Sequence, residues 1–108
     1  MTEVSPVQAE ELVRASKAVL VDVREKGETE SGMAAPALWF PTSQIDPDDA
    51  GWKKFLTSLP KDKTVILYCA SGMRSAGVAE YLADQGYTTA NMGGFSSWKS
   101  AGFPVRMP

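Results

Sequence analysis

The chain contains no histidine and a single cysteine, Cys69. The absence of imidazole excludes Cys-His and Ser-His-Asp catalytic groups and the usual zinc sites. With one cysteine, no internal disulfide can form, and no second thiol can resolve a covalent intermediate on the first. A nucleophilic Cys69 would therefore need activation by backbone dipoles or by a cation, and an outside molecule would have to discharge it.

The chain also lacks a surplus of positive charge and long apolar runs. Its net charge is −2, and no basic patch stands out, so we expect no nucleic-acid partner. The apolar runs are too short to span a bilayer, and residues 1–11 are polar and acidic, unlike a signal peptide. We expect no membrane partner and a cytoplasmic location, with a periplasmic one open if an export signal was removed. The 108 residues suffice for one domain, residues 1–108.

The stretch from Thr64 to Gln85 organises the chain. Val65–Tyr68 is an unbroken β-branched and apolar run, which is typical of a strand buried on both faces of a parallel sheet. A helical pattern starts near Ser75 and ends at Gly86. Its apolar stripe comprises Ala76, Ala79, Leu82 and Ala83. Cys69 comes at the carboxyl end of the strand, where open α/β sheets place their ligand sites.

The segment between this strand and this helix favours a reactive thiolate at Cys69. Because it leads directly into the helix, several free N–H groups and the positive end of the helix dipole should face the sulfur. Gly72 lets the chain curl into an anion-binding nest, and Arg74 adds a permanent cation. Such surroundings lower the pKa of a thiol. The alternative is a buried structural cysteine, since free cysteine is among the most buried residue types.

The remaining chain alternates between helical and strand patterns. We expect a helix from Pro6 to about Ala15, capped by Ser5 and Gln8. Acidic residues 46–49 suit the start of another helix better than a metal site. Further expected segments are a strand over 19–23, a loop over 25–35, a strand over 37–40, a strand over 87–92 broken by Gly93-Gly94, and a helix over 95–100 with Trp98 inward. This alternation predicts an α/β domain with a mainly parallel sheet.

Four motifs in order resemble one known family. Cys69–Arg74 reads C-A-S-G-M-R and resembles the C-x-x-G-x-R active loop of rhodanese-domain sulfurtransferases. Asp22–Arg24 resembles the D-V-R that ends the family's first core strand. Residues 32–41 resemble its G-H-I-x-G-A-x-x-I-P stretch, and residues 93–105 resemble its closing G-G-x-x-x-W…G-[FY]-P-V. The resemblance covers nearly the whole chain.

Two positions depart from the family pattern. Met33 stands where the family's His is usual, and Pro36 replaces its second Gly. The change at Met33 removes a polar contact from this stretch without touching the nucleophile.

The resemblance implies the rhodanese version of the α/β fold, a central five-stranded, mainly parallel sheet with helices on both faces. It implies a sulfurtransferase of the thiosulfate sulfurtransferase type, which moves a sulfane sulfur from a donor such as thiosulfate through a Cys69 persulfide. The acceptor would be cyanide or a cellular thiol, with a protein acceptor also open. No metal or cofactor is implied, and we expect a monomer. The candidate substrate-binding residues are Ala70, Ser71, Gly72, Met73, Arg74 and Ser75.

Asp22 and Arg24 have two interpretations. They form either a structural ion pair, with Asp22 capping a loop, or a direct support of the active-loop surroundings.

Two other functions remain open. Related domains of this fold are phosphatases or arsenate reductases, but cysteine phosphatases place five residues between Cys and Arg. Only four lie between Cys69 and Arg74, and a shorter ring of N–H groups suits one extra sulfur atom better than a phosphoryl group. A non-catalytic or regulatory rhodanese-like module that carries or binds sulfur is the second alternative, although such modules often lack the loop cysteine.

Overall fold

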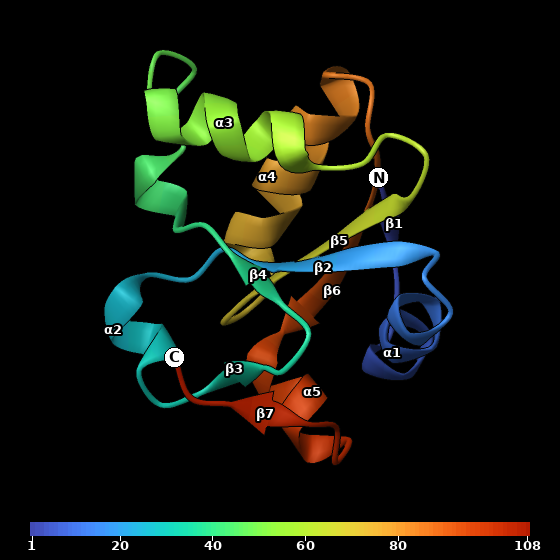
Figure 1. The fold of residues 1–108 in the computed structure, drawn as a ribbon. Helices are drawn as coiled ribbons and strands as arrows, with labels where there is room; N and C mark the ends of the chain where they lie inside the picture. Colours follow the sequence, from blue (N-terminus) through green and yellow to red (C-terminus); the bar gives the residue numbers. More distant parts are fainter.

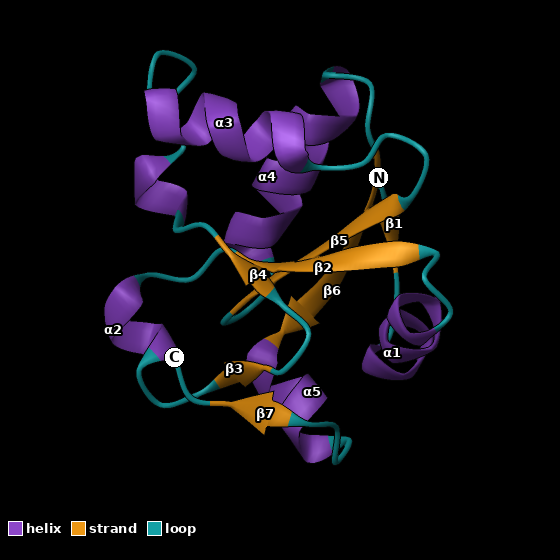
Figure 2. Cartoon of the chain, viewed as in Figure 1, coloured by secondary structure: helices purple, strands orange, loops and turns teal.

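A computed structural model describes all 108 residues, and its centre is a five-stranded parallel sheet (Figures 1 and 2). The strands lie in the order β1-β6-β5-β2-β4, and each adjacent pair is parallel. Their bounds are Thr2–Glu3 for β1, Thr88–Gly94 for β6, Thr64–Cys69 for β5, Ala18–Asp22 for β2 and Leu38–Trp39 for β4. The predicted α/β class and five-stranded sheet are confirmed.

Helices cover both faces of the sheet (Figure 1). On one face lie α1 (Pro6–Arg14) and α5 (Phe95–Ser100), and on the other lie α3 (Ala50–Ser58) and α4 (Met73–Asp84). None of these helices has the length and apolar character needed to cross a membrane. The short elements are α2 (Lys26–Thr29), a 3-10 turn at Thr42–Gln44, and the antiparallel pair β3 (Met33–Ala34) and β7 (Val105–Arg106).

Strand β5 contributes to the hydrophobic core on both faces, because successive side chains of a strand point in opposite directions. One set packs with α3 and α4, namely Val65, Leu67 and Cys69. The other set, Ile66 and Tyr68, packs with α1 and α5. All five are buried, so the unbroken apolar run correctly predicted a strand covered on both sides. The alternation also places Cys69 on the α4 face.

The start signals predicted for α1 are present, whereas α3 begins only at Ala50, after the acidic residues that were expected in its first turn. Ser5 and Gln8 form the reciprocal capping box of α1, with Pro6 at its first position. Asp49 caps α3 by accepting a hydrogen bond from the backbone N–H of Trp52. Helix α5 covers the predicted residues, and its Trp98 is fully buried.

Three segments differ from the sequence expectations. The predicted loop over 25–35 contains α2 and β3, because Glu25 and Glu28 form a capping box that closes a single helical turn. The strand Thr2–Glu3 at the edge of the sheet was not expected, since two residues show no periodicity. Gly93-Gly94 does not break the chain but forms the end of β6. Met33, at the family's usual His position, is buried in the core beneath α5.

Candidate active site

Cys69 is the last residue of β5, and its side chain lies at the carboxyl edge of the sheet beneath the start of α4. The residue is buried, with 0% of its surface exposed. Residues 70–74 pass over the sulfur, and we call residues 69–75 the active loop. Within it, Ala70, Ser71 and Met73 are exposed, whereas Ser75 is buried. The loop therefore shields the sulfur from bulk water.

Two hydrogen-bond donors lie within reach of the Cys69 sulfur. The backbone N–H of Gly72 donates to Sγ at 3.0 Å, and the Ser75 hydroxyl lies 3.3 Å from Sγ. Burial alone would raise the pKa of the Cys69 thiol. The Ser75 hydroxyl and the amides of Ser75, Gly72 and Ser71 outweigh that effect and lower the pKa below its ordinary value. Backbone donors of the loop therefore face the Cys69 sulfur, as predicted. Ser75 contributes its hydroxyl and its amide, whereas Ser71 contributes only its amide.

Two glycines allow the active loop to lie directly on β6. Gly72 has a φ of +95°, a left-handed conformation that turns its N–H toward the sulfur. A Cβ atom at Gly72 would lie 3.1 Å from Gly93 Cα, and a Cβ atom at Gly94 would collide with the Ala70 carbonyl oxygen. The Gly93-Gly94 pair thus gives the loop room to approach the sheet.

Asn91 on β6 connects the sheet to the active loop, a role that was not predicted from the sequence. Its Nδ2 donates to the Gly72 carbonyl oxygen at 2.9 Å, and its Oδ1 accepts from the Gly93 N–H at 3.0 Å. The Ser75 hydroxyl donates to the same Oδ1 at 2.8 Å. Asn91 lies at a β-bulge in which Met92 is an extra residue opposite β5. Sequence patterns do not signal a bulge at this position, so Asn91 could not be found in advance.

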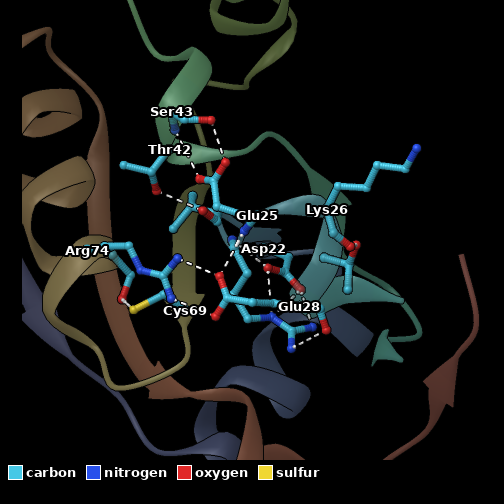
Figure 3. Close-up of polar contacts among 12 residues, drawn as sticks. Asp22, Glu25, Lys26, Glu28, Thr42, Ser43, Cys69 and Arg74 are labelled. Atoms are coloured by element: carbon cyan, nitrogen blue, oxygen red, sulfur yellow. Dashed lines mark hydrogen bonds and ion pairs between the residues drawn. The ribbon is translucent and has the colours of Figure 1, made fainter. Parts of the chain in front are cut away.

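Arg74 forms an ion pair with a residue of α2. Figure 3 shows its guanidinium turned toward Glu28, and the two side chains form a bidentate ion pair with distances of 2.6 and 2.8 Å. The hydrogen bonds that Arg74 donates to Glu28 raise the pKa of Arg74, and the charge of Cys69 adds to this effect. The Arg74 hydrogen bond lowers the pKa of Glu28 to about 2, so the pair stays ionised at neutral pH. The predicted cation is beside the active loop, but a carboxylate shares its charge.

Glu28 was missed because the segment 25–35 looked like a loop. The spacing of Glu25 and Glu28 is that of a capping box, and this signal could have indicated α2. It could not have indicated Arg74 as the partner, which lies 46 residues further along the chain.

Asp22 and Arg24 form a buried ion pair at the end of β2. The Arg24 Nη2 donates to Asp22 Oδ2 at 2.8 Å and to the Gly32 carbonyl oxygen at 2.7 Å, and Nη1 reaches the Glu28 carbonyl oxygen at 3.3 Å. The guanidinium also lies 4.3 Å from the centre of the Phe95 ring. This geometry corresponds to the structural alternative. The pair fixes the backbone of α2, and α2 in turn presents Glu28 to Arg74.

Two shallow grooves flank the active loop. One, of about 430 Å³, lies toward β1 and β6 and includes Ser71, Gly72, Met73 and Asn91. The other, of about 360 Å³, lies between the segment 42–47 and α4 and includes Arg74. A small molecule can therefore approach the loop from either side.

Breaking the Asp22–Arg24 pair should destabilise the fold strongly. In Arg24→Met the Asp22 carboxylate stays buried without its cation, and we expect the free energy of unfolding to fall by about 3–5 kcal/mol in a urea titration. The double variant Asp22→Asn/Arg24→Met removes the buried charge and should recover part of the loss. A loss below about 1 kcal/mol in Arg24→Met would show that Asp22 does not depend on the pair.

The acidity of Cys69 can be measured by the pH dependence of its alkylation by iodoacetamide. Because only the thiolate reacts, the midpoint reports the thiol pKa, and we expect it below the free value of about 8.5. Ser75→Ala should raise the midpoint, since one donor to the sulfur is lost. A wild-type midpoint at or above the free value would mean that the loop does not activate the sulfur.

Comparison with known proteins shows the family of this chain. A sequence model of the rhodanese-like domain family matches residues 5–101. A sulfurtransferase from Allochromatium vinosum is 36% identical over 92 residues, which cover 83% of this chain and 79% of that protein. The thiosulfate sulfurtransferase GlpE of Actinobacillus succinogenes is 33% identical, over 96% of this chain and 89% of that protein.

A solved structure is similar over its full length. The crystal structure of a rhodanese-related protein from Thermoplasma volcanium has a TM-score of 0.81 and 28% identity, with all of both chains covered. The motifs, the five-stranded sheet and the family match over most of the chain lead to one conclusion: this chain belongs to the rhodanese-like domain family.

Proposed function

We propose that this protein is a sulfurtransferase of the thiosulfate sulfurtransferase type, which carries a sulfane sulfur on Cys69. The observation that carries the proposal is the convergence of the Gly72 amide and the Ser75 hydroxyl on the sulfur of the only cysteine. The relatives named sulfurtransferase and thiosulfate sulfurtransferase support the same reaction class.

In the first step the Cys69 thiolate attacks the outer sulfur of thiosulfate. A bond forms between Sγ and that sulfur, the S–S bond of thiosulfate breaks, and its electron pair leaves on sulfite. The enzyme then holds a Cys69 persulfide, whose single negative charge is the charge that the thiolate had. The amides of Ser71, Gly72 and Ser75 are the groups placed to stabilise this charge. Ala70 and Met73 are exposed on the outer side of the loop, where a donor could contact them.

In the second step an acceptor nucleophile attacks the sulfane sulfur. The S–S bond of the persulfide breaks, its electron pair returns to Sγ, and the thiolate is regenerated. Cyanide would leave as thiocyanate, and a thiol would leave as a persulfide. Since the chain has no second cysteine, the acceptor must be an outside molecule, either a small thiol or a protein thiol.

Every group assigned to this reaction comes from one chain, so we propose that the protein works as a monomer. The reducing cytoplasm holds abundant thiols that suit the second step, and we propose that location.

The loop geometry favours sulfur transfer over phosphoryl transfer. Phosphoryl groups require several donors around three charged oxygens, including a positioned cation. Here one N–H on each of Nη1 and Nη2 of Arg74 bonds a carboxylate oxygen of Glu28, so the guanidinium has only part of its donors left for an anion. The remaining donors lie close to a single buried sulfur, an arrangement that suits one added sulfur atom.

The formation of the persulfide can be observed directly by intact mass. Incubation with thiosulfate should increase the mass by one sulfur atom, and cyanide should remove this increment with release of thiocyanate. One cysteine permits one persulfide and no internal disulfide. Cys69→Ser is the matched control, because serine is nearly the same size but cannot hold a sulfane sulfur.

The outcome separates the three functions. A phosphatase would hydrolyse p-nitrophenyl phosphate and give no sulfur increment, and a binding module would do neither. If thiosulfate, 3-mercaptopyruvate and a small persulfide all fail to load Cys69, the proposed function is wrong. An increment that persists in Cys69→Ser would exclude Cys69 as the carrier.

Arg74 should matter for thiosulfate use because the sulfonate is an anion. In Arg74→Ala we expect the KM for thiosulfate to rise about tenfold or more, the effect of losing a hydrogen bond to a charged group. Arg74→Lys should recover only part of the loss, since an ammonium lacks the planar fork of donors. The measurement is steady-state thiocyanate formation at varied thiosulfate.

Glu28→Gln distinguishes a donor-binding Arg74 from a merely structural one. This variant weakens the ion pair but leaves the guanidinium in place. If Arg74 binds the donor, Glu28→Gln should keep a low KM. If Arg74 only holds α2 to the active loop, Glu28→Gln should reproduce Arg74→Ala, and equal activity in all variants would remove Arg74 from the reaction.

A further inference from the structure

The Ser75 hydroxyl has one proton and two acceptors within reach. Its oxygen lies 2.8 Å from Asn91 Oδ1 and 3.3 Å from Cys69 Sγ. Both distances suit a hydrogen bond, since sulfur is the larger atom. A hydroxyl donates only one hydrogen bond at a time. The proton must therefore be directed either to the sulfur or to the amide oxygen.

The orientation of the Asn91 side chain is determined by the backbone around it. Its Nδ2 faces the Gly72 carbonyl oxygen, an acceptor, and its Oδ1 faces the Gly93 N–H, a donor. A flipped amide would place its oxygen against the Gly72 carbonyl oxygen and its NH2 group against the Gly93 N–H, so both hydrogen bonds would be lost. The oxygen is thus the atom that faces Ser75. Because an amide oxygen has two lone pairs, it keeps Gly93 as a partner whether or not Ser75 donates to it.

We propose that Ser75 and Asn91 form a hydroxyl switch: the Ser75 proton points to Asn91 when Cys69 is a thiol or a persulfide, and turns to Sγ when Cys69 is a thiolate. The inference rests on the proposed function, in which Cys69 alternates between these forms. An anionic sulfur is a stronger acceptor than an amide oxygen, whereas a thiol or a persulfide inner sulfur is a weaker one. Asn91 acts through Ser75 and is a positioning residue.

The switch assists the second step of sulfur transfer. When the persulfide bond breaks, its electron pair moves to Sγ, which becomes a thiolate. Rotation of the Ser75 hydroxyl then supplies a donor where negative charge develops. Asn91 Oδ1 loses this donor but retains the Gly93 N–H, so the rotation leaves no buried polar atom without a partner.

The charged groups near Cys69 do not replace this switch. Arg74 of α4 is paired with Glu28 of α2, and Glu25 adds a further negative charge near Arg74. At the end of β2, Asp22 and Arg24 neutralise each other's charge. Strand β6 contributes no charged side chain, so the neutral Asn91 is its polar contact with the loop.

A cycle of four proteins tests the switch: the wild type, Ser75→Ala, Asn91→Leu and the double variant. In each, the midpoint of Cys69 alkylation by iodoacetamide is measured against pH. Ser75→Ala should raise the midpoint because the thiolate loses a donor. Asn91→Leu removes the competing acceptor and excludes water from its place. Asn91→Leu should therefore shift the alkylation midpoint to lower pH when Ser75 is present than it does in the Ser75→Ala background.

The difference between the two Asn91→Leu shifts should be about 0.5 pH unit, the size expected of one neutral hydrogen bond. General loosening of the active loop changes the midpoint in both backgrounds and cancels in this difference. Thr89→Val is the matched control. It removes a side-chain hydrogen bond from β6 to the Ala79 carbonyl of α4 without touching Ser75, and it should leave the midpoint unchanged.

A difference of zero, or one of the opposite sign, would overturn the switch. Because alkylation needs no sulfur donor, this result is independent of turnover. Normal thiosulfate turnover with zero coupling would reject the switch and retain the sulfurtransferase. The expected coupling without any sulfur loading would support the switch and reject the proposed function.

Discussion

The buried sulfur of Cys69 must become an anion without an imidazole nearby, and the architecture around it follows from this constraint. Burial opposes the charge, so donors must be supplied at close range. They come from the turn between β5 and α4, where the first amides of a helix have no intrahelical partner. A serine at the third residue of α4 adds a hydroxyl on the same side. The sheet and the helix are thus needed together, because neither alone surrounds one atom with donors.

Holding these donors in place requires contacts well outside the loop. Gly72 adopts a left-handed conformation, and the Gly93-Gly94 end of β6 lets the loop lie on the sheet. On the other side, Arg24 is bound to Asp22 and to the backbone of α2, so it fixes the turn that carries Glu28. The motif at the end of β2 therefore influences the active loop through Glu28 rather than by touching it.

Local patterns predicted most of the fold, whereas contacts between distant segments were beyond them. The apolar run of β5, the capping box of α1 and the helix around Trp98 are encoded within short stretches, and each formed as predicted. Cys69 was indicated by its place between a buried strand and a helix, and the structure has it as the last residue of β5. Glu28 and Asn91 were missed because their roles depend on partners far away in the sequence and, for Asn91, on a bulge.

The charge of Arg74 does not dominate the electrostatic potential at the active loop, because Glu28 balances it. Arg74 and Glu28 together carry no net charge, so their attraction and repulsion for a distant anion nearly cancel. At short range the guanidinium still presents N–H donors in a fixed plane. An approaching sulfonate would therefore meet directional hydrogen bonds rather than a bare positive charge. The thiolate inside the loop depends chiefly on the Ser75 hydroxyl and on backbone amides, which stay in place whether or not a small molecule is bound.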